Sequence, residues 1–531
     1  METSVPLQRI VVALIAVALA AGTAAAAPAR GGTLTIGLDQ EPPSLDPQAS
    51  PSASTFVVDA DVAESLLYEG PNGKIVPWLA TAYQVSADGK VFTFTLEPNA
   101  SFSDGAPVDA AAVKWNFDRV VNPGFKAGVS LTALNGYAGT TVVDDHTVRV
   151  AFSAPFAPFL TYLAGGWLAL LSPKSTPGQG TAVGQRPVTS GPFTISEYVA
   201  GDHVALTRNA AYARRAPWSD HTGPPNLDRI VWRFIPEAGT RVTTVQTGET
   251  QMISFQSVPA TMLTRLAADK NLRVDKTPYP GVPRIWLLNT RLAPTNELKV
   301  RQAIEYGVNR AALVDALYNG LATVACAPLT RYTLDDPSFC KTYGYDPKKA
   351  AQLLDEDGWR MGPNNMRVRD GKPLTVVFNS VNYGAGNFPE VELIQGQLLG
   401  LGIDAQIKSQ ARAPWFEDSL HCATNGPELF LRDPDMNGLF ALFDSVNIGG
   451  NFNFSCYANP DIDRLLAAGR ATYDPGKRRA AYLGVERILL DQAVAVPLFD
   501  ELAVYVSRST VQGTKYNYSA YPVLSDVSMQ K

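Results

Sequence analysis

The segment LTVVFNSVNYGAGNFPEVELIQGQLLGLGIDAQI, residues 374–407, decides the fold class of this chain. Its two ends, Leu374–Phe378 and Gly402–Ile407, are short apolar runs of the kind that form buried strands. Between them, about Val391–Leu399 has the pattern of a helix. A helix that joins two strands is the crossover that parallel strands require. The C-terminal half is therefore predicted to be α/β with a parallel sheet.

The segments on either side continue this pattern. Upstream, Asn309 is expected to cap a helix that Gly320 closes, and Asp346-Pro347 is expected to begin another. Downstream, the sequence predicts two helices and then two strands, over about 460–471, 475–491, Val496–Phe499 and Leu502–Val506.

The N-terminal half is richer in strands. Residues 33–38 (TLTIGL) alternate between polar and apolar side chains, and Asp88-Gly89 lies between two further alternating runs, which predicts a hairpin. A short apolar helix is expected over 62–69. Asp109 is expected to cap a longer helix that runs to about Val121.

Composition narrows the class of function. The chain has 531 residues, 45 Lys and Arg against 50 Asp and Glu, and a net charge of −5. Such a length suggests two or three domains. Because no large positive field exists, a nonspecific nucleic-acid binder is excluded.

The N-terminal residues predict export. Arg9 precedes an apolar run from Ile10 to about Ala21, and Ala24-x-Ala26 fits a cleavage site, so residues 1–26 are predicted to be a signal peptide. The alternative is a membrane anchor, but the run is short for a bilayer core. We expect a soluble periplasmic protein. It should not be a lipoprotein, since no cysteine precedes Cys326.

The four cysteines are interpreted in the light of that compartment. They permit three pairings, of which the sequential one, Cys326 with Cys340 and Cys422 with Cys456, is the simplest. A metal site is the rival interpretation, but the sequence contains no CxxC motif. We expect neither a metal site nor a cofactor.

Catalytic motifs are missing from the sequence. It has no G-x-S-x-G, no H-E-x-x-H, no P-loop and no G-x-G-x-x-G, and its four histidines are scattered. We therefore expect no enzyme. An exported hydrolase remains the alternative, and it would need a nucleophile–base pair.

Several short stretches occur in an order that resembles the family 5 extracellular solute-binding proteins, the peptide, nickel and dipeptide receptors of ABC importers. The stretches are Gly31–Leu38 with Leu45-Asp46-Pro47, Leu67–Gly70, Pro77–Ala80, Asp88–Leu96, Phe102–Pro107, Ser190–Phe193, Leu206–Asn209, Val300–Ala303, Tyr345–Pro347, Asp433-Pro434-Asp435, Asn459–Asp463 and Pro497-Leu498.

The resemblance implies an α/β fold of the periplasmic-binding-protein type, with two lobes around a hinged cleft and three domains, as in cluster C. Domain I would comprise 27–62, 191–284 and 500–531, domain II the β-rich insertion 63–190, and domain III the residues 285–499. The hinge strands would lie near Val282–Leu288 and Pro497–Val504.

The resemblance also implies a function. The chain would capture a peptide-like or other small polar solute between its lobes and deliver it to an ABC permease in the inner membrane, as a monomer. A peptide-binding chaperone without a transport role is a further alternative. The solute would be an oligopeptide, an opine, a glycoside or a similar molecule.

Two departures from dipeptide-binding relatives bear on the ligand. Phe430 stands where those relatives place the Asp that holds the peptide amino group, and Val381 replaces their Arg for the peptide carboxylate, whereas Tyr383 is retained. Losing one partner of a buried charge is costly, so these changes argue against a free dipeptide.

The remaining candidates for ligand contact are mostly amides and aromatic residues, with Arg432 as the proposed anchor for a carboxylate or phosphate. Each Asn has an alternative role as an ordinary loop residue, Trp286 as core, and Arg432 as a structural partner of Asp433 or Asp435. The predicted ligand-binding residues are Gln40, Glu41, Trp286, Asn289, Asn379, Asn382, Tyr383, Phe430, Arg432, Asp433, Asn447, Asn451 and Asn453.

Overall fold

The computed structural model describes residues 30–50, 52–254, 258, 260–382, 389–425 and 428–530. The predicted signal peptide, residues 1–26, and the candidate Tyr383 lie outside these residues. Within them, no helix has both the length and the apolar character needed to cross a membrane.

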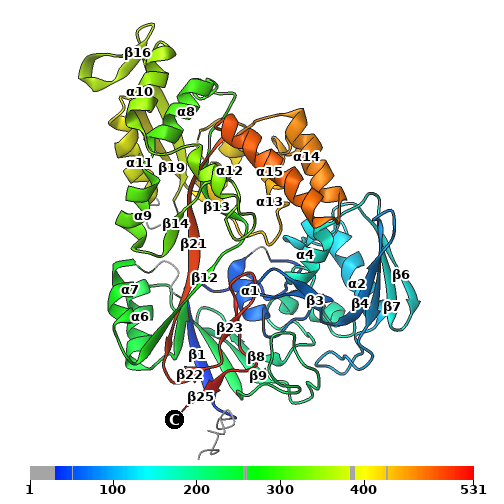
Figure 1. Cartoon of the computed structure of the whole chain (residues 1–531). Helices are drawn as coiled ribbons and strands as arrows, with labels where there is room; N and C mark the ends of the chain where they lie inside the picture. The colour runs from blue at the N-terminus through cyan, green and yellow to red at the C-terminus, as the bar shows by residue number, and fades with distance from the viewer. Residues whose placement is uncertain are drawn as a thin grey trace, which may run out of the picture.

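A mixed sheet of ten described strands runs through both halves of the molecule (Figure 1). Its main path runs β20-β13-β21-β11-β1-β10-β9-β8, and β12 and β14 also pair with β21. The strands are β1 (Thr33–Leu38), β8 (Phe193–Val199), β9 (His203–Arg208), β10 (Arg229–Phe234), β11 (Met252–Ser254), β12 (Leu272–Pro278), β13 (Val282–Leu287), β14 (Ala322–Val324), β20 (Glu428–Leu431) and β21 (Ala495–Arg508).

Strand β21 is the longest described strand, with 14 residues, and it belongs to both halves of the molecule. Its first half pairs with β13 and β14, and its second half pairs with β11 and β12. In Figure 1 it runs through the centre, from the upper to the lower half. The predicted strands 496–499 and 502–506 are therefore one strand, because the polar pair Asp500-Glu501 lies within the ladder and does not end it.

The lower half, here called lobe 1, contains a second sheet. It is antiparallel, in the order β4-β5-β7-β6, and α2 packs on it. The predicted Asp88-Gly89 hairpin joins β4 to β5, and the Asp109 side chain accepts from Ala112 N–H at 2.7 Å, as an N-cap. The elements are β4 (Ala80–Val85), β5 (Val91–Leu96), α2 (Ala110–Val121), α3 (Ser130–Ala133), β6 (Tyr137–Asp144), β7 (Thr147–Phe152) and α4 (Pro158–Ala164).

The predicted helix over 62–69 is wrong. Helix α1 covers Ala53–Asp59, and the chain then extends into β2 (Leu67–Glu69), which pairs with β3 (Ile75–Pro77). Glu64 of the predicted helix is fully buried and ion-paired with Arg214, so tertiary contacts decide this segment.

The upper half, lobe 2, contains the parallel unit that the sequence predicts. Strands β18 and β19 pair in parallel over seven residues, and α11 connects them. The elements are α8 (Leu298–Gly307), α9 (Arg310–Tyr318), α10 (Pro347–Glu356), β18 (Thr375–Val381), α11 (Pro389–Leu399), β19 (Asp404–Gln410), α12 (Arg412–Leu420), α13 (Gly438–Phe443), α14 (Pro460–Ala471) and α15 (Pro475–Asp491).

The hydrophobic cores follow the two lobes. One large core gathers apolar side chains from 34–252 and 503–527, and two further cores draw only on 282–499. A smaller core joins α6 (Ala238–Thr247) and α7 (Ala260–Ala267) to β21. The three predicted domain boundaries stay a prediction.

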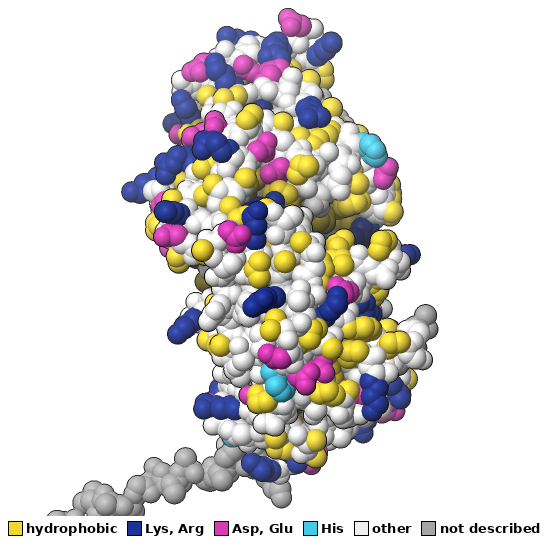
Figure 2. Space-filling view, turned by 90° about the vertical axis from the view of Figure 1, so that its right-hand side faces the viewer, with side chains coloured by type: hydrophobic (Ala, Val, Ile, Leu, Met, Phe, Trp, Pro, Cys, Tyr) yellow, Lys and Arg dark blue, Asp and Glu magenta, His cyan; other side chains and the backbone are white. Residues whose placement is uncertain are grey.

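Two disulfides connect irregular segments, in the sequential pairing. Cys326 is bonded to Cys340 and Cys422 to Cys456, and the described residues hold no free cysteine. On the face shown in Figure 2, basic and acidic side chains are interspersed. This face therefore offers no extended basic surface for nucleic acid.

Candidate functional site at the junction of the lobes

The chain passes between the lobes at two places in the described structure, the β12–β13 connection and β21. These strands lie near the predicted hinge segments. Gly281, between β12 and β13, has a positive φ of 101°, and a Cβ there would lie 2.2 Å from the Leu431 carbonyl oxygen. Only glycine fits where the β12–β13 connection passes so close to the end of β20.

The lobes also touch away from these strands. Ala157 N–H donates to the Arg470 carbonyl at 2.8 Å, and the Tyr473 hydroxyl donates to the Gly89 carbonyl at 2.9 Å. Arg470 and Tyr473 lie at the end of α14 and just after it in lobe 2, whereas Gly89 and Ala157 belong to lobe 1. The lobes are therefore in contact near the end of α14 as well as at the strands that join them.

A cavity of about 490 Å³ lies between the lobes. Residues of β2, β3 and α4 line it from lobe 1, residues around α13 and α15 line it from lobe 2, and Thr277, Pro278 and Pro280 line it at the hinge. This volume is in the range of small-molecule sites.

Carboxylates concentrate beside this cavity. Glu69 ends β2, and Asp433 and Asp435 flank Pro434 just after β20. Asp435 is ion-paired with Arg478 of α15, and Asp433 accepts from the Tyr162 hydroxyl at 3.3 Å. Burial, and then the neighbouring carboxylates, raise the pKa of Glu69 well above its usual range, and the pKa of Asp433 is raised in the same way.

Arg432 lies directly before this carboxylate segment and reaches the hinge. Its guanidinium is stacked 3.8 Å from the centre of the Tyr279 ring, and its Nη2 is 3.9 Å from a carboxylate oxygen of Glu501 in β21. Burial alone would lower the pKa of Arg432, but Tyr279 and Glu501 outweigh it and the pKa is raised. The side chain is therefore a permanent cation, and its buried Nε has no hydrogen-bond partner among the described residues.

A second arginine at the hinge lies close to three carboxylates. Arg284 of β13 donates to Glu501 at 2.7 Å and lies 3.4 Å from Glu428 and 3.6 Å from Glu390. The Phe430 ring lies 4.4 Å from its guanidinium. The predicted candidate Phe430 therefore packs between Arg284 and Arg432, whose guanidinium is 5.3 Å away. Cation–π contacts of this kind hold the two arginines in place.

Three predicted candidates are buried in lobe 2. Trp286 is 1% exposed and stacks on Phe378 at 4.2 Å, in a hydrophobic core. The Asn289 amide donates to the carbonyls of Cys422 and Thr424, at 2.9 and 3.0 Å. The Asn379 amide faces the Trp415 carbonyl at 3.2 Å, and its oxygen accepts from Gln410.

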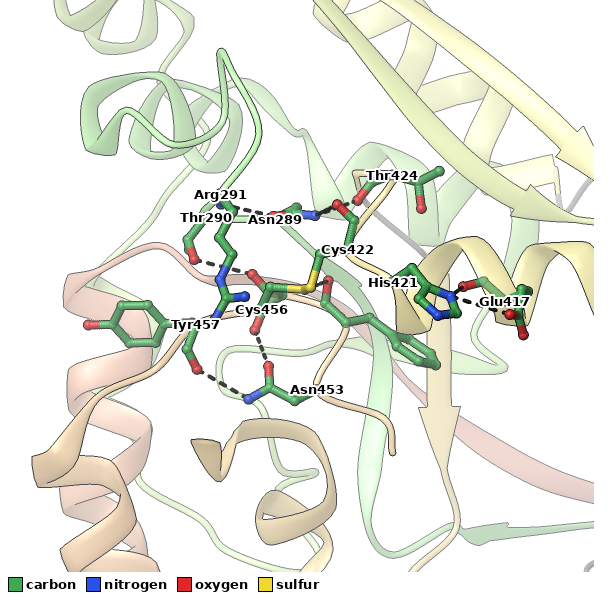
Figure 3. Close-up of a disulfide and its surroundings, with 12 residues drawn as sticks. Asn289, Thr290, Arg291, Glu417, His421, Cys422, Thr424, Asn453, Cys456 and Tyr457 are labelled. Atoms are coloured by element: carbon green, nitrogen blue, oxygen red, sulfur yellow. Dashed lines mark hydrogen bonds and ion pairs between the residues drawn. A yellow bond between two sulfur atoms is a disulfide. The ribbon is translucent and has the colours of Figure 1, made fainter. Parts of the chain in front are cut away.

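The asparagines near the Cys422–Cys456 disulfide make local bonds. Asn453 donates to the carbonyls of Asp444 and Tyr457, Asn447 donates to the Phe440 carbonyl, and Asn451 donates to Asn447. Figure 3 shows Asn289 and Asn453 pointing toward backbone groups on either side of this disulfide. These amides therefore have hydrogen-bond partners within the loop itself.

The other candidates are spread over both lobes. Gln40 is exposed, and the Glu41 carboxylate binds the Tyr198 hydroxyl and Gly201 N–H. The Asn382 backbone N–H donates to the Gln410 carbonyl. The structure thus brings Phe430, Arg432 and Asp433 together at the lobe junction, while Glu41 and the asparagines make separate local hydrogen bonds and Gln40 is exposed.

Sequence reasoning missed several residues of the junction, namely Glu69, Tyr162, Tyr279, Arg478, Glu501 and Tyr518. For Glu69 a signal existed, because a glutamate ends the apolar run Leu66–Tyr68. Charged residues are rarely buried unless they are paired, so a carboxylate at the end of such a run indicates a specific role. The tyrosines carried no comparable signal.

Two lobes joined by strands of a shared sheet, with a polar cavity between them, define a bilobal solute-binding protein. The chain belongs to the bacterial extracellular solute-binding proteins, family 5, whose model matches residues 74–435. In keeping with this family, it is a solute-binding component of ABC transport.

Two curated relatives are glutathione-binding proteins. GsiB of Salmonella paratyphi A is 30% identical over 516 residues, which covers 94% of this chain and 95% of that protein. GsiB of Escherichia coli K12 is 29% identical over 483 residues, covering 88% and 89%.

Solved structures share the fold at lower identity. NikA from Brucella suis, in complex with Fe(III)-EDTA, has a TM-score of 0.83 and 23% identity, covering 94% of this chain and all of that one. DppA from Helicobacter pylori, in complex with the peptide STSA, has a TM-score of 0.76 and 24% identity, covering 95% and 99%. Their likeness supports the bilobal fold.

Proposed function

We propose that the solute is a small peptide-like molecule with a free carboxylate, and that Arg432 is its anchor. The observation that carries the proposal is the environment of Arg432. It is a cation at the lobe junction, held by Tyr279 and Glu501, with a buried Nε donor that has no partner among the described residues. A buried donor without an acceptor is costly, and a ligand carboxylate would satisfy it.

The two glutathione-binding relatives support this ligand class, since glutathione is a tripeptide with free carboxylates. The departures at Phe430 and Val381 still argue against a free dipeptide held in the usual way. Glutathione is therefore the first probe, and other short peptides and opines follow.

Transport would use closure of the lobes. A solute that binds the closed form better than the open form shifts the population toward the closed form. The β12–β13 connection and β21 would act as the hinge, and the closed protein would dock on an ABC permease of the inner membrane. We expect the exported protein to act in the periplasm as a monomer.

The test is titration calorimetry with glutathione and a peptide panel, on the wild type and on Arg432→Ala. The variant should bind a carboxylate ligand more than about tenfold more weakly, because a charge-assisted bond is lost. Arg464→Ala is the matched control, since Arg464 is exposed on α14 and pairs only with Asp461 in the described structure. Equal affinity in wild type and Arg432→Ala would overturn the anchor role.

A further inference from the structure

The interlobe cavity is lined by a buried carboxyl group that has no cationic partner among the described residues. Glu69 lines the cavity and is 5% exposed, and it forms no ion pair among the described residues. Its Oε2 is buried without a hydrogen-bond partner, and the same is true of Asp435 Oδ2. Both carboxylates therefore have acceptor capacity at the cavity that the described part of the protein does not use.

The cations nearby do not compensate for Glu69. Arg478 is the one basic residue among the described residues that line the cavity, and it is ion-paired with Asp435. Asp433 lies close enough to Glu69 to raise its pKa further. A positive charge placed in the cavity would relieve this repulsion and allow Glu69 to ionise.

The lining favours an organic cation over a metal ion. No cluster of His, Cys, Asp and Glu among the described residues has the arrangement that holds a metal. The cavity instead presents the amide and hydroxyl side chains of Asn72, Thr161, Thr277 and Thr333, together with the ring of Tyr518. Neutral acceptors and an aromatic ring suit an ammonium or guanidinium group.

We propose that this cavity is a cation subsite, in which Glu69 of lobe 1 and Asp435 of lobe 2 bind the ammonium or guanidinium group of the solute. The proposal rests on the proposed function, since it locates the positive end of the same solute. It explains how the chain holds an amine although Phe430 replaces the usual Asp. Because the two carboxylates come from different lobes, the bound cation also favours the closed form.

The test uses agmatine, which carries a guanidinium and an ammonium but no carboxylate, so that Arg432 plays no part. Agmatine should raise the melting temperature of the wild type in a concentration-dependent manner at constant ionic strength. In Glu69→Gln the apparent Kd for agmatine should be at least about tenfold weaker. Glu392→Gln removes an exposed carboxylate on α11 and should behave as the wild type.

The test does not fail through misfolding of the variant. Glu69→Gln replaces a buried carboxyl that has no ion-pair partner among the described residues and whose pKa is raised by burial, so the variant should melt at least as high as the wild type. Butanediol, an uncharged molecule of similar length, serves as a second probe on the wild-type protein and should give no stabilisation.

The outcomes separate this proposal from the previous one. Any of three outcomes would overturn the cation subsite. Agmatine could stabilise the wild type and Glu69→Gln equally, butanediol could stabilise the wild type as strongly as agmatine does, or agmatine could have no effect on the wild type. Failure of the carboxylate anchor would instead appear as equal binding of glutathione or another peptide to the wild type and Arg432→Ala, with the agmatine result unaffected.

Discussion

At the residue scale, the asparagines show that a side chain suited to a polar ligand can have its hydrogen-bonding groups occupied by the protein itself. Asn289 has 0% exposure, and its amide joins two carbonyls from the segment that carries Cys422. The sequence could identify such residues as polar and near the cleft. It could not show which backbone groups they face, because those groups lie more than 130 positions away.

Asn289→Ala should therefore lower stability and leave ligand affinity unchanged. Losing buried hydrogen bonds of this kind costs about 1–3 kcal/mol. Chemical denaturation measures the first effect and calorimetry with glutathione the second. A large loss of affinity at unchanged stability would restore Asn289 as a ligand contact.

Glu486 on α15 gives a pH-dependent prediction. One of its oxygens accepts from Leu329 N–H at 2.9 Å, the other has no partner among the described residues, and burial raises its pKa to about 8. The folded state thus holds a proton that the unfolded state loses near pH 4.5, so this group's contribution to stability falls as the pH rises from there to about 8.

Glu486→Gln keeps the acceptor for Leu329 and cannot ionise. The melting temperature of the variant relative to the wild type should therefore be higher at pH 8 than at pH 5, by about 2 °C or more. Melting curves at the two pH values give this difference. The same difference at both values would contradict a raised pKa at this position.

At the scale of elements, the starts of several helices could be predicted because a capping residue next to each start determines it. Asp109, Asn309 and Asp346 cap the helices that follow them, as expected. The two errors have tertiary causes, because residues 62–69 are held by β3 and Arg214, and β21 continues through Asp500-Glu501 to connect the lobes. Neither cause can be inferred from a short window of sequence.

The Cys422–Cys456 disulfide gives a prediction for the loop between α12 and α14. It closes a separation of 34 residues, for which the chain-entropy model gives about 4 kcal/mol. The double variant Cys422→Ser/Cys456→Ser should melt below the oxidised wild type. A reductant should then lower its melting temperature less than that of the wild type, since only Cys326–Cys340 is left to reduce. Equal melting temperatures without reductant would contradict a stabilising bond.

At the scale of the whole molecule, the order of short stretches predicted the family and the bilobal fold. The site was predicted only in part. The candidates Phe430, Arg432 and Asp433 are close in sequence and lie together at the lobe junction, whereas Glu69, Arg478 and Tyr518, which line the cavity, come from distant segments. Only the contact between the two lobes brings these together.

Two side-chain contacts with lobe 1 should help to hold that arrangement: the Arg470 guanidinium donates to the Asn135 amide oxygen at 3.2 Å, and the Tyr473 hydroxyl donates to the Gly89 carbonyl at 2.9 Å. In Arg470→Ala/Tyr473→Ala the open form should become more populated, so the radius of gyration measured by small-angle X-ray scattering should increase without ligand. A saturating ligand should reverse the increase. An unchanged radius would show that these contacts do not govern closure.

Native mass spectrometry of the protein isolated without unfolding tests the central claim, capture of a carboxylate-bearing solute by Arg432, most directly. The wild type is predicted to carry a small carboxylate-bearing molecule, and Arg432→Ala to carry markedly less of it. Equal occupancy of the two proteins by the same molecule, or a bound species without a carboxylate, would contradict the claim.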